Sequence, residues 1–194
     1  FTVGGYYDEK AKSSGLRITS NGATYYNGTT YGSPSNLSSC LTTGKTFYNG
    51  NECRTETVVD IDVSKMLKGP DNNANTTADT IWPSNGVIYA ETPVRLINAD
   101  TLPGPLTIVS PYNVYVNGDF NKELPTQADF IARYGSATPS NSDILNSTST
   151  YTKKKAAAIC TTGRIFFLSK SWKDSEHTAS NNQNKNADDP VSFT

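Results

Sequence analysis

Residues 86–97 read Gly86-Val87-Ile88-Tyr89-Ala90-Glu91-Thr92-Pro93-Val94-Arg95-Leu96-Ile97, two short β-prone runs joined by a polar corner. A second pair of runs follows as Leu106-Thr107-Ile108-Val109 and Val114-Tyr115-Val116. The first runs of the two pairs lie 19 residues apart, from Ile88 to Thr107, and the second runs lie 20 apart, from Arg95 to Tyr115. A return about every 20 residues is typical of a solenoid, whose short strands stack into parallel sheets. An antiparallel meander of similar strands is the alternative.

The same pattern resumes after an interruption, as Ala157-Ala158-Ile159-Cys160 and Arg164-Ile165-Phe166-Phe167-Leu168. We therefore expect an all-β protein with a short β-solenoid of about three rungs, at 87–97, 106–116 and 157–168. The insertion 120–155 should leave the coil and carry a short helix over 126–135, which has a threonine at its start and a glycine at its end. The expected organisation is an N-terminal hairpin and loop-rich region (1–85), a solenoid-like region (86–174) and a polar C-terminal segment (175–194).

Turn signals organise the N-terminal region. Asn21-Gly22 lies between Leu16-Arg17-Ile18-Thr19 and Thr24-Tyr25-Tyr26, and Asn-Gly between β-prone runs predicts a hairpin. A short helix is expected over 64–68, since Gly69-Pro70 would end it. Asp60 and Asp62 precede it, and we interpret them as a solvated strand face or a helix cap in preference to a metal or acid–base pair.

The composition excludes several classes of protein. Only 35% of the 194 residues are hydrophobic and 18% are charged, while Asn, Ser and Thr together make up about a third. This composition favours β-structure with many loops over long amphipathic helices. A formal net charge of −1 gives no general attraction to nucleic acid, so no nucleic-acid partner is expected. No apolar run reaches the roughly 18–20 residues of a membrane span.

Cysteine usage bears on location. Cys40 and Cys53 lie 13 residues apart in a stretch with little apolar material. A disulfide between them would stabilise that loop by about 3 kcal/mol in the chain-entropy model, and two thiols are the alternative. Cys160 lies in an apolar run and is expected to be a buried thiol. The predicted disulfide and the low charge favour an extracellular or cell-surface location.

The sequence contains few candidate catalytic or metal-binding residues. His177 is the one histidine and follows Asp174-Ser175-Glu176, but a catalytic triad converges from separate elements, so we predict no catalytic residue. No metal site is predicted, although calcium could bind at Asn117-Gly118-Asp119 or Asp188-Asp189, where oxygen ligands gather. The acids at the ends of the predicted runs would serve an enzyme only if two of them met in one groove. These acids are Glu91, Asp100, Asp119 and Asp174.

Aromatic residues offer a possible binding surface in the N-terminal region. Its members are Tyr25, Tyr26, Tyr31 and Tyr48. Exposed rings supply contact area for sugars or proteins, whereas sealing a small core is their commoner role.

The region 86–174 resembles bacterial PilX-like pilus-assembly proteins and minor pilins that carry a β-solenoid insert. The resemblance rests on the runs quoted above, together with Leu102-Pro103-Gly104-Pro105, Asn117-Gly118-Asp119-Phe120-Asn121 and Leu168-Ser169-Lys170-Ser171-Trp172-Lys173-Asp174. It implies a non-enzymatic surface component, pilus-associated or adhesin-like, whose partners are other pilus or surface subunits or further copies in a filament. It brings no catalytic residue or cofactor with it. The alternative is a polysaccharide-active β-helix enzyme that uses corner carboxylates such as Asp119.

Overall fold

The computed structural model describes residues 15–26, 29–30, 40–68, 82–83, 85–122 and 155–179. This part of the chain is all-β, as the composition and the alternating runs predict. Its strands are β1 (Leu16–Thr19), β2 (Gly22–Tyr26), β3 (Thr29–Thr30), β4 (Leu41–Asn49), β5 (Arg54–Asp62), β6 (Val87–Ala90), β7 (Val94–Ile97), β8 (Leu106–Ser110), β9 (Val114–Asn117), β10 (Ala157–Thr161) and β11 (Ile165–Leu168). The helices are α2 (Val63–Lys68) and the 3₁₀ turn η2 (Asp174–Glu176). The predicted helix over 126–135 lies outside the described residues.

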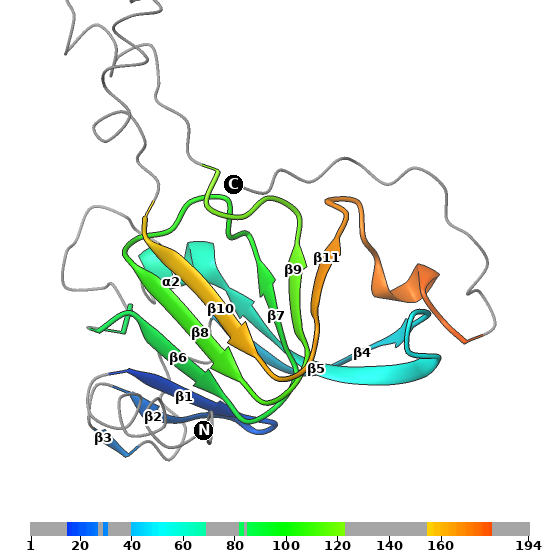
Figure 1. The fold of residues 1–194 in the computed structure, drawn as a ribbon, viewed down its shortest axis with the longest axis horizontal. Helices are drawn as coiled ribbons and strands as arrows, with labels where there is room; N and C mark the ends of the chain where they lie inside the picture. Colours follow the sequence, from blue (N-terminus) through cyan, green and yellow to red (C-terminus); the bar gives the residue numbers. More distant parts are fainter. Residues whose placement is uncertain are drawn as a thin grey trace, which may run out of the picture.

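The strands form two sheets, and from β6 to β11 the chain passes alternately from one sheet to the other. One sheet has the order β10-β8-β6-β1-β2-β3 and the other the order β11-β9-β7-β5-β4. Neighbours from β1 to β10 and from β5 to β11 pair in parallel. Figure 1 shows the sheets meeting at the tight corners that join β6 to β7, β8 to β9 and β10 to β11, and spreading apart beyond them. The antiparallel meander is therefore wrong for these strands.

The register places equivalent residues of successive passes side by side. Arg95 pairs with Tyr115, as the 20-residue spacing predicts, and Tyr115 pairs with Phe166 across the interruption. In the first sheet Ile88 pairs with Ile108 rather than with Thr107, one residue from the 19-residue count. The three predicted pairs of strands are thus present, and β1 and β5 each extend one of the two parallel ladders.

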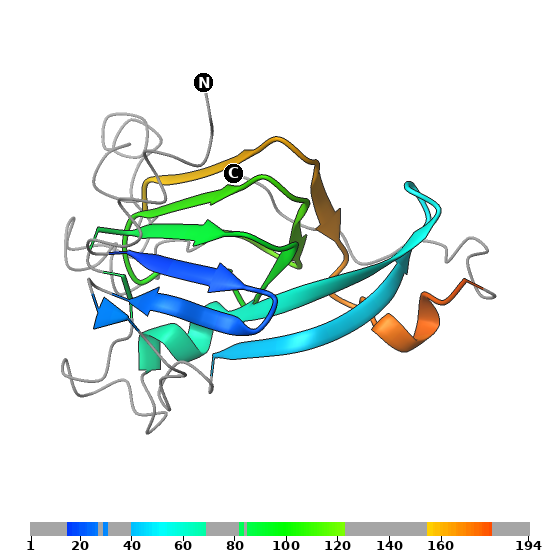
Figure 2. The same cartoon turned by 90° about the horizontal axis from the view of Figure 1, so that it is seen from below.

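Two hairpins lie at the N-terminal side of the sheets. The predicted β1–β2 hairpin is confirmed; its two turn residues are Ser20 and Asn21, and Gly22 begins β2 opposite Thr19. Strands β4 and β5 form a longer antiparallel hairpin of nine residues each, which was not predicted as a unit. Figure 2 shows this hairpin reaching out from the body, beside the orange segment that contains η2.

The main core fills the space between the two sheets. Its residues alternate along the strands with side chains of the outer faces, so that Val94 and Leu96 are fully buried in this core while Arg95 faces the other way. Val63 and Met66 of α2 belong to the same cluster. The side chain of Asp62 accepts bonds from Ser64 Oγ (2.7 Å) and from the backbone N–H of Lys65 (3.3 Å), so it caps the helix.

The predicted disulfide between Cys40 and Cys53 is wrong. Cys40 precedes β4 and Cys53 lies in the turn that follows it, so the nine residues of β4 separate them. At the usual rise of an extended strand that length is about 30 Å, whereas the Cα atoms of a disulfide lie about 4.4–6.8 Å apart. Both residues carry thiols. The prediction that Cys160 is buried is also wrong, because β10 is the last strand of its sheet and its residues are exposed or half-buried.

Candidate functional site

The two predicted corner acids Asp100 and Asp119 line one pocket. The pocket has a volume of about 320 Å³ and lies where β7 and β9 end, beside Asn98, Asn117 and Lys170. The side chain of Asp119 is only 3% exposed, and it forms ion pairs with Lys122 (2.9 Å) and Lys170. The two ammonium groups neutralise the charge of this one carboxylate. Through them Asp119 joins the start of the insertion to the segment that follows β11.

The other two predicted acids lie elsewhere and are also paired. Glu91 accepts a bond of 2.7 Å from Arg17, which joins the corner after β6 to β1. Asp174 binds Arg95, which is itself 4% exposed and holds both carboxylate oxygens of Asp60 at 2.7 and 2.8 Å. Asp60, which the sequence placed on a solvated strand face, is thus buried beneath the C-terminal segment.

The charge of Asp174 is stabilised by this network. Partial burial raises its pKa, but the hydrogen bonds and the charge of Arg95, with the indole N–H of Trp172 at 3.0 Å, outweigh burial and hold the pKa below its ordinary value. Burial likewise lowers the pKa of Arg95, and the two carboxylates more than reverse that effect. A carboxyl with a lowered pKa is ionised at neutral pH and cannot donate a proton as a general acid.

An aromatic groove lies on the outer face of the second sheet, between the β4–β5 hairpin and the C-terminal segment. Its volume is about 210 Å³. Its lining residues come from the β4–β5 hairpin, β9, β11 and the C-terminal segment: Phe47, Tyr48, Asn49, Gly50, Asn51, Tyr115, Phe166, Phe167, Leu168, Trp172 and His177. Of the predicted aromatic surface only Tyr48 is among them. Tyr31 and the side chains of Tyr25 and Tyr26 lie outside the described residues.

Ring contacts shape the groove. Tyr115 stacks on Phe166, with ring centroids 5.0 Å apart and an angle of 12°, because the two residues are in register on β9 and β11. Phe47 meets the ring of Tyr115 edge-on at 5.0 Å and that of Trp172 at 5.4 Å. The ring of His177 stacks on Trp172 with an angle of 7°. Since Asp174 faces Arg95 and His177 faces an indole, the sequence Asp174-Ser175-Glu176-His177 does not form a catalytic triad.

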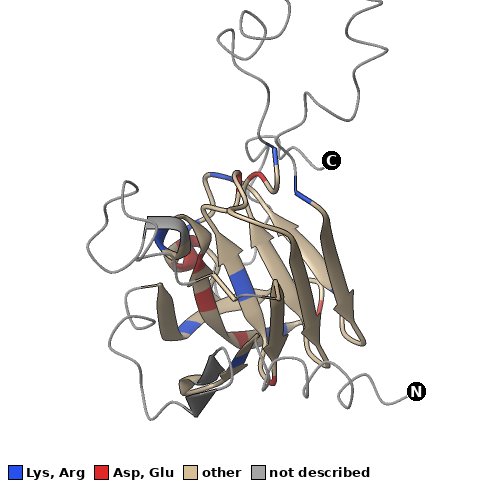
Figure 3. Ribbon diagram, turned by 90° about the vertical axis from the view of Figure 1, so that its left-hand side faces the viewer, with Lys and Arg blue, Asp and Glu red and all other residues tan. Residues whose placement is uncertain are grey.

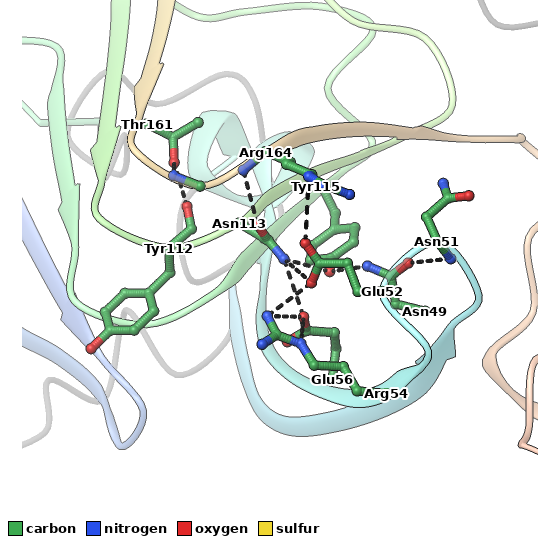
Figure 4. Close-up of polar contacts among 11 residues, drawn as sticks. Asn49, Asn51, Glu52, Arg54, Glu56, Tyr112, Asn113, Tyr115, Thr161 and Arg164 are labelled. Carbon is green, nitrogen blue, oxygen red and sulfur yellow. Dashed lines mark hydrogen bonds and ion pairs between the residues drawn. The ribbon is translucent and has the colours of Figure 1, made fainter.

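A polar network supports the groove at the hairpin turn (Figure 4). Asn49 donates to the hydroxyl of Tyr115 at 2.9 Å, and Asn113 donates to the same hydroxyl at 3.3 Å. Asn113 also reaches Glu52 at 2.9 Å and Glu56 at 3.1 Å. This pair of carboxylates was not among the predicted acids, although the spacing Glu52-Cys53-Arg54-Thr55-Glu56 was visible in the sequence.

Arginine side chains pair with the two glutamates. Arg54 binds Glu52 at 2.9 Å and Glu56 at 2.7 Å. Slight desolvation raises the pKa of Glu52, but the hydrogen bond from Asn113 and the charges of Arg54 and Arg164 bring it below the ordinary value. Burial raises the pKa of Tyr115 to about 12, so its hydroxyl remains protonated and can hold the network together. The network therefore ties the hairpin turn to Asn113 and Tyr115 beside the groove.

Within the residues that the structure describes, no three His, Cys, Asp or Glu side chains gather as a metal ion would require. The predicted calcium corner at Asn117-Gly118-Asp119 holds the Asp119–lysine pairs instead, and Asp188-Asp189 lies outside the described residues. None of the described helices has the length and apolar character that crossing a bilayer demands.

Comparison with other proteins adds no relative to this picture: no family model, no curated protein and no solved structure matches the chain.

Proposed function

We propose that this chain is a non-enzymatic extracellular surface component, pilus-associated or adhesin-like, built on a short β-solenoid. The solenoid would have four rungs, formed by β1 with β5, β6 with β7, β8 with β9, and β10 with β11. The parallel pairing Arg95–Tyr115–Phe166 in one sheet and Ile88–Ile108–Ile159 in the other supports this reading. Stacked rungs give a stiff rod that presents loops and hairpins to a partner.

The observation that carries the proposal is the state of the carboxylates. Glu91, Asp119 and Asp174 each bind an arginine or lysine from a distant part of the chain. Hydrolysis of a glycoside needs one carboxyl that stays protonated and a second one within reach of the same bond. These ion pairs join distant parts of the chain, and the pKa of Asp174 is held below its ordinary value, which suits a scaffold.

The resemblance of residues 86–174 to PilX-like pilus-assembly proteins supports the surface location and the choice of partners. The partners would be other pilus or surface subunits or further copies of this chain. The groove beside the β4–β5 hairpin is then a candidate contact region, because the hairpin stands clear of the body (Figure 2).

A polysaccharide-active enzyme is the second candidate. One observation favours it: Asp100 and Asp119 line the same pocket. Against it, Lys122 and Lys170 both bind Asp119, so one of the two carboxylates is already committed to an ion-pair triad.

Immunogold electron microscopy of the source cells tests the proposal, combined with an assay of the purified chain on a panel of polysaccharides. We expect gold particles on the cell surface or along filaments, and no turnover. Label confined to the cell interior would contradict the proposal. So would cleavage of a glycan that is lost in Asp119→Asn and retained in Asp174→Asn.

A further inference from the structure

The aromatic groove has rigid walls. Beneath it, Arg95 joins Asp60 on β5 to Asp174 of the C-terminal segment, and the indole N–H of Trp172 binds Asp174 at 3.0 Å. At its rim the backbone N–H of Tyr48 donates to the carbonyl of His177 at 2.8 Å, which fastens the segment to β4. A groove held by buried ion pairs and strand hydrogen bonds is largely formed before any ligand arrives.

The polar groups of the groove are amides rather than charges. The Asn49 side chain donates one N–H to the hydroxyl of Tyr115 and accepts from the backbone N–H of Asn51 at 3.1 Å, which leaves its second N–H for a ligand. Asn51 lies exposed in the hairpin turn, and its amide offers both a donor and an acceptor. These amides stand next to the rings of Tyr48, Phe166 and Trp172, each of them half-buried.

Charge selects the ligand further. No Asp, Glu, Lys or Arg is among the lining residues. The network below the groove sets Arg95 against Asp60 and Asp174, and the charge of Lys45 also acts on Asp174, so the charges there are balanced among themselves. An anionic ligand would find no cation in the lining to pair with. A cationic ligand would lose its hydration and gain little attraction in return, because the carboxylates beneath the groove are already paired with Arg95. The groove therefore favours an uncharged ligand.

We propose that the aromatic groove binds one ring of a neutral saccharide, with the C–H face of the sugar on the aromatic rings and its hydroxyls on the amides of Asn49 and Asn51. Its volume of about 210 Å³ lies below the roughly 300–1,000 Å³ of common small-molecule pockets, which limits the contact to a single ring. This inference deepens the proposed function, on which it rests: the adhesin-like partner would be a neutral glycan.

The test is saturation-transfer NMR with the full chain and the methyl glycosides of glucose, galactose, mannose and N-acetylglucosamine, followed by calorimetric titration of any sugar that responds. Sodium glucuronate and an aromatic tripeptide serve as an anionic and a peptide probe. We expect at least one neutral glycoside to bind, weakly and with saturation. Asn51→Ala and Phe166→Ala should weaken that binding at least tenfold.

Tyr112→Ala is the matched control, because it removes an aromatic ring that is 47% exposed and lies outside the groove. It should leave the affinity unchanged, and circular dichroism verifies that each variant is folded. No response to any neutral glycoside, binding that survives both groove variants, or preference for glucuronate or the tripeptide would each overturn the inference. Surface labelling of the cells would stand even then, so failure of the sugar site is distinguishable from failure of the proposed function.

Discussion

Replacing Gly86 by alanine tests the stacking of successive corners. Gly86 precedes β6 with a φ of +67°, and a Cβ there would lie 2.3 Å from the carbonyl oxygen of Pro105, which precedes β8. The obstacle is backbone of the next pass, held by the bond from the N–H of Thr107 to the Gly86 carbonyl at 2.7 Å. The left-handed φ costs an alanine about 1 kcal/mol, and the overpacked contact adds about 1–3 kcal/mol. We expect Gly86→Ala to lower the free energy of unfolding by about 2–4 kcal/mol.

Gly44→Ala is the matched control for this substitution. Gly44 has a φ of +70°, and a Cβ there would meet nothing within 4 Å. Gly44→Ala should therefore lower the free energy of unfolding only by the cost of the left-handed φ, about 1 kcal/mol. Urea unfolding followed by tryptophan fluorescence measures both variants, and the difference between them isolates the corner contact. Equal losses in the two variants would refute the reasoning, since they would mean that nothing from the next pass stands against Gly86.

Three further predictions concern the ion pairs and the thiols. Arg95→Met should lower the free energy of unfolding by roughly 3–5 kcal/mol in urea titrations, because it strands two carboxylates beneath the C-terminal segment; a loss under 1 kcal/mol would contradict the buried network. Because the pKa of Asp174 is lowered on folding, its ionised carboxylate should stabilise the fold fully above its unfolded pKa of about 3.9. This stabilisation should disappear as the pH falls through the pKa of Asp174 in the folded protein, and Asp174→Asn should remove this part of the acid sensitivity. Burial raises the pKa of Cys40 to about 12, so iodoacetamide at pH 8 should label Cys53 and Cys160 in the native protein and Cys40 only after unfolding; a Cys40–Cys53 crosslink in non-reducing mass spectrometry would overturn the hairpin geometry.

The parallel passes could be predicted from the sequence because each pass repeats the same inward positions. Ile88 and Ile108 occupy equivalent core sites, and the corners between the runs have nearly constant length. The count from Ile88 to Thr107 missed the register by one residue, since the first runs of the two pairs differ in length. The β1–β2 hairpin could also be predicted, because the Asn21-Gly22 signal is local and needs no knowledge of distant strands.

The places of β1 and β5 could not be predicted, since these strands meet the parallel sheets from positions far apart in the chain. The β2, β3 and β4 strands lie between them, which hides the 20-residue spacing. Strand β4 could not be predicted from the sequence, because residues 42–46 are all exposed and show no alternation of apolar and polar side chains. The disulfide prediction failed for the same reason: without β4, the segment from Cys40 to Cys53 looked like a loop instead of one arm of a hairpin.

The candidate site was the least predictable feature. The sequence identified acids at corners but could not show the cations opposite them, since Arg17 and Glu91 lie 74 residues apart and Arg95 and Asp174 lie 79 apart. The aromatic groove combines the hairpin, β9, β11 and the C-terminal segment, and only Tyr48 carried a local signal. Long-range pairing of this kind follows from the register of the sheets, which the sequence indicates only in part.

The most direct test of this account is a set of backbone NOE contacts that reports the order and direction of the stacked strands. The parallel arrangement predicts cross-strand contacts from the backbone of Arg95 to that of Tyr115 and from Tyr115 to Phe166, in the staggered pattern of parallel neighbours. Close Hα–Hα contacts between β7 and β9, which only antiparallel neighbours make, or the absence of any contact between Tyr115 and Phe166, would contradict the parallel sheet and the groove that depends on it.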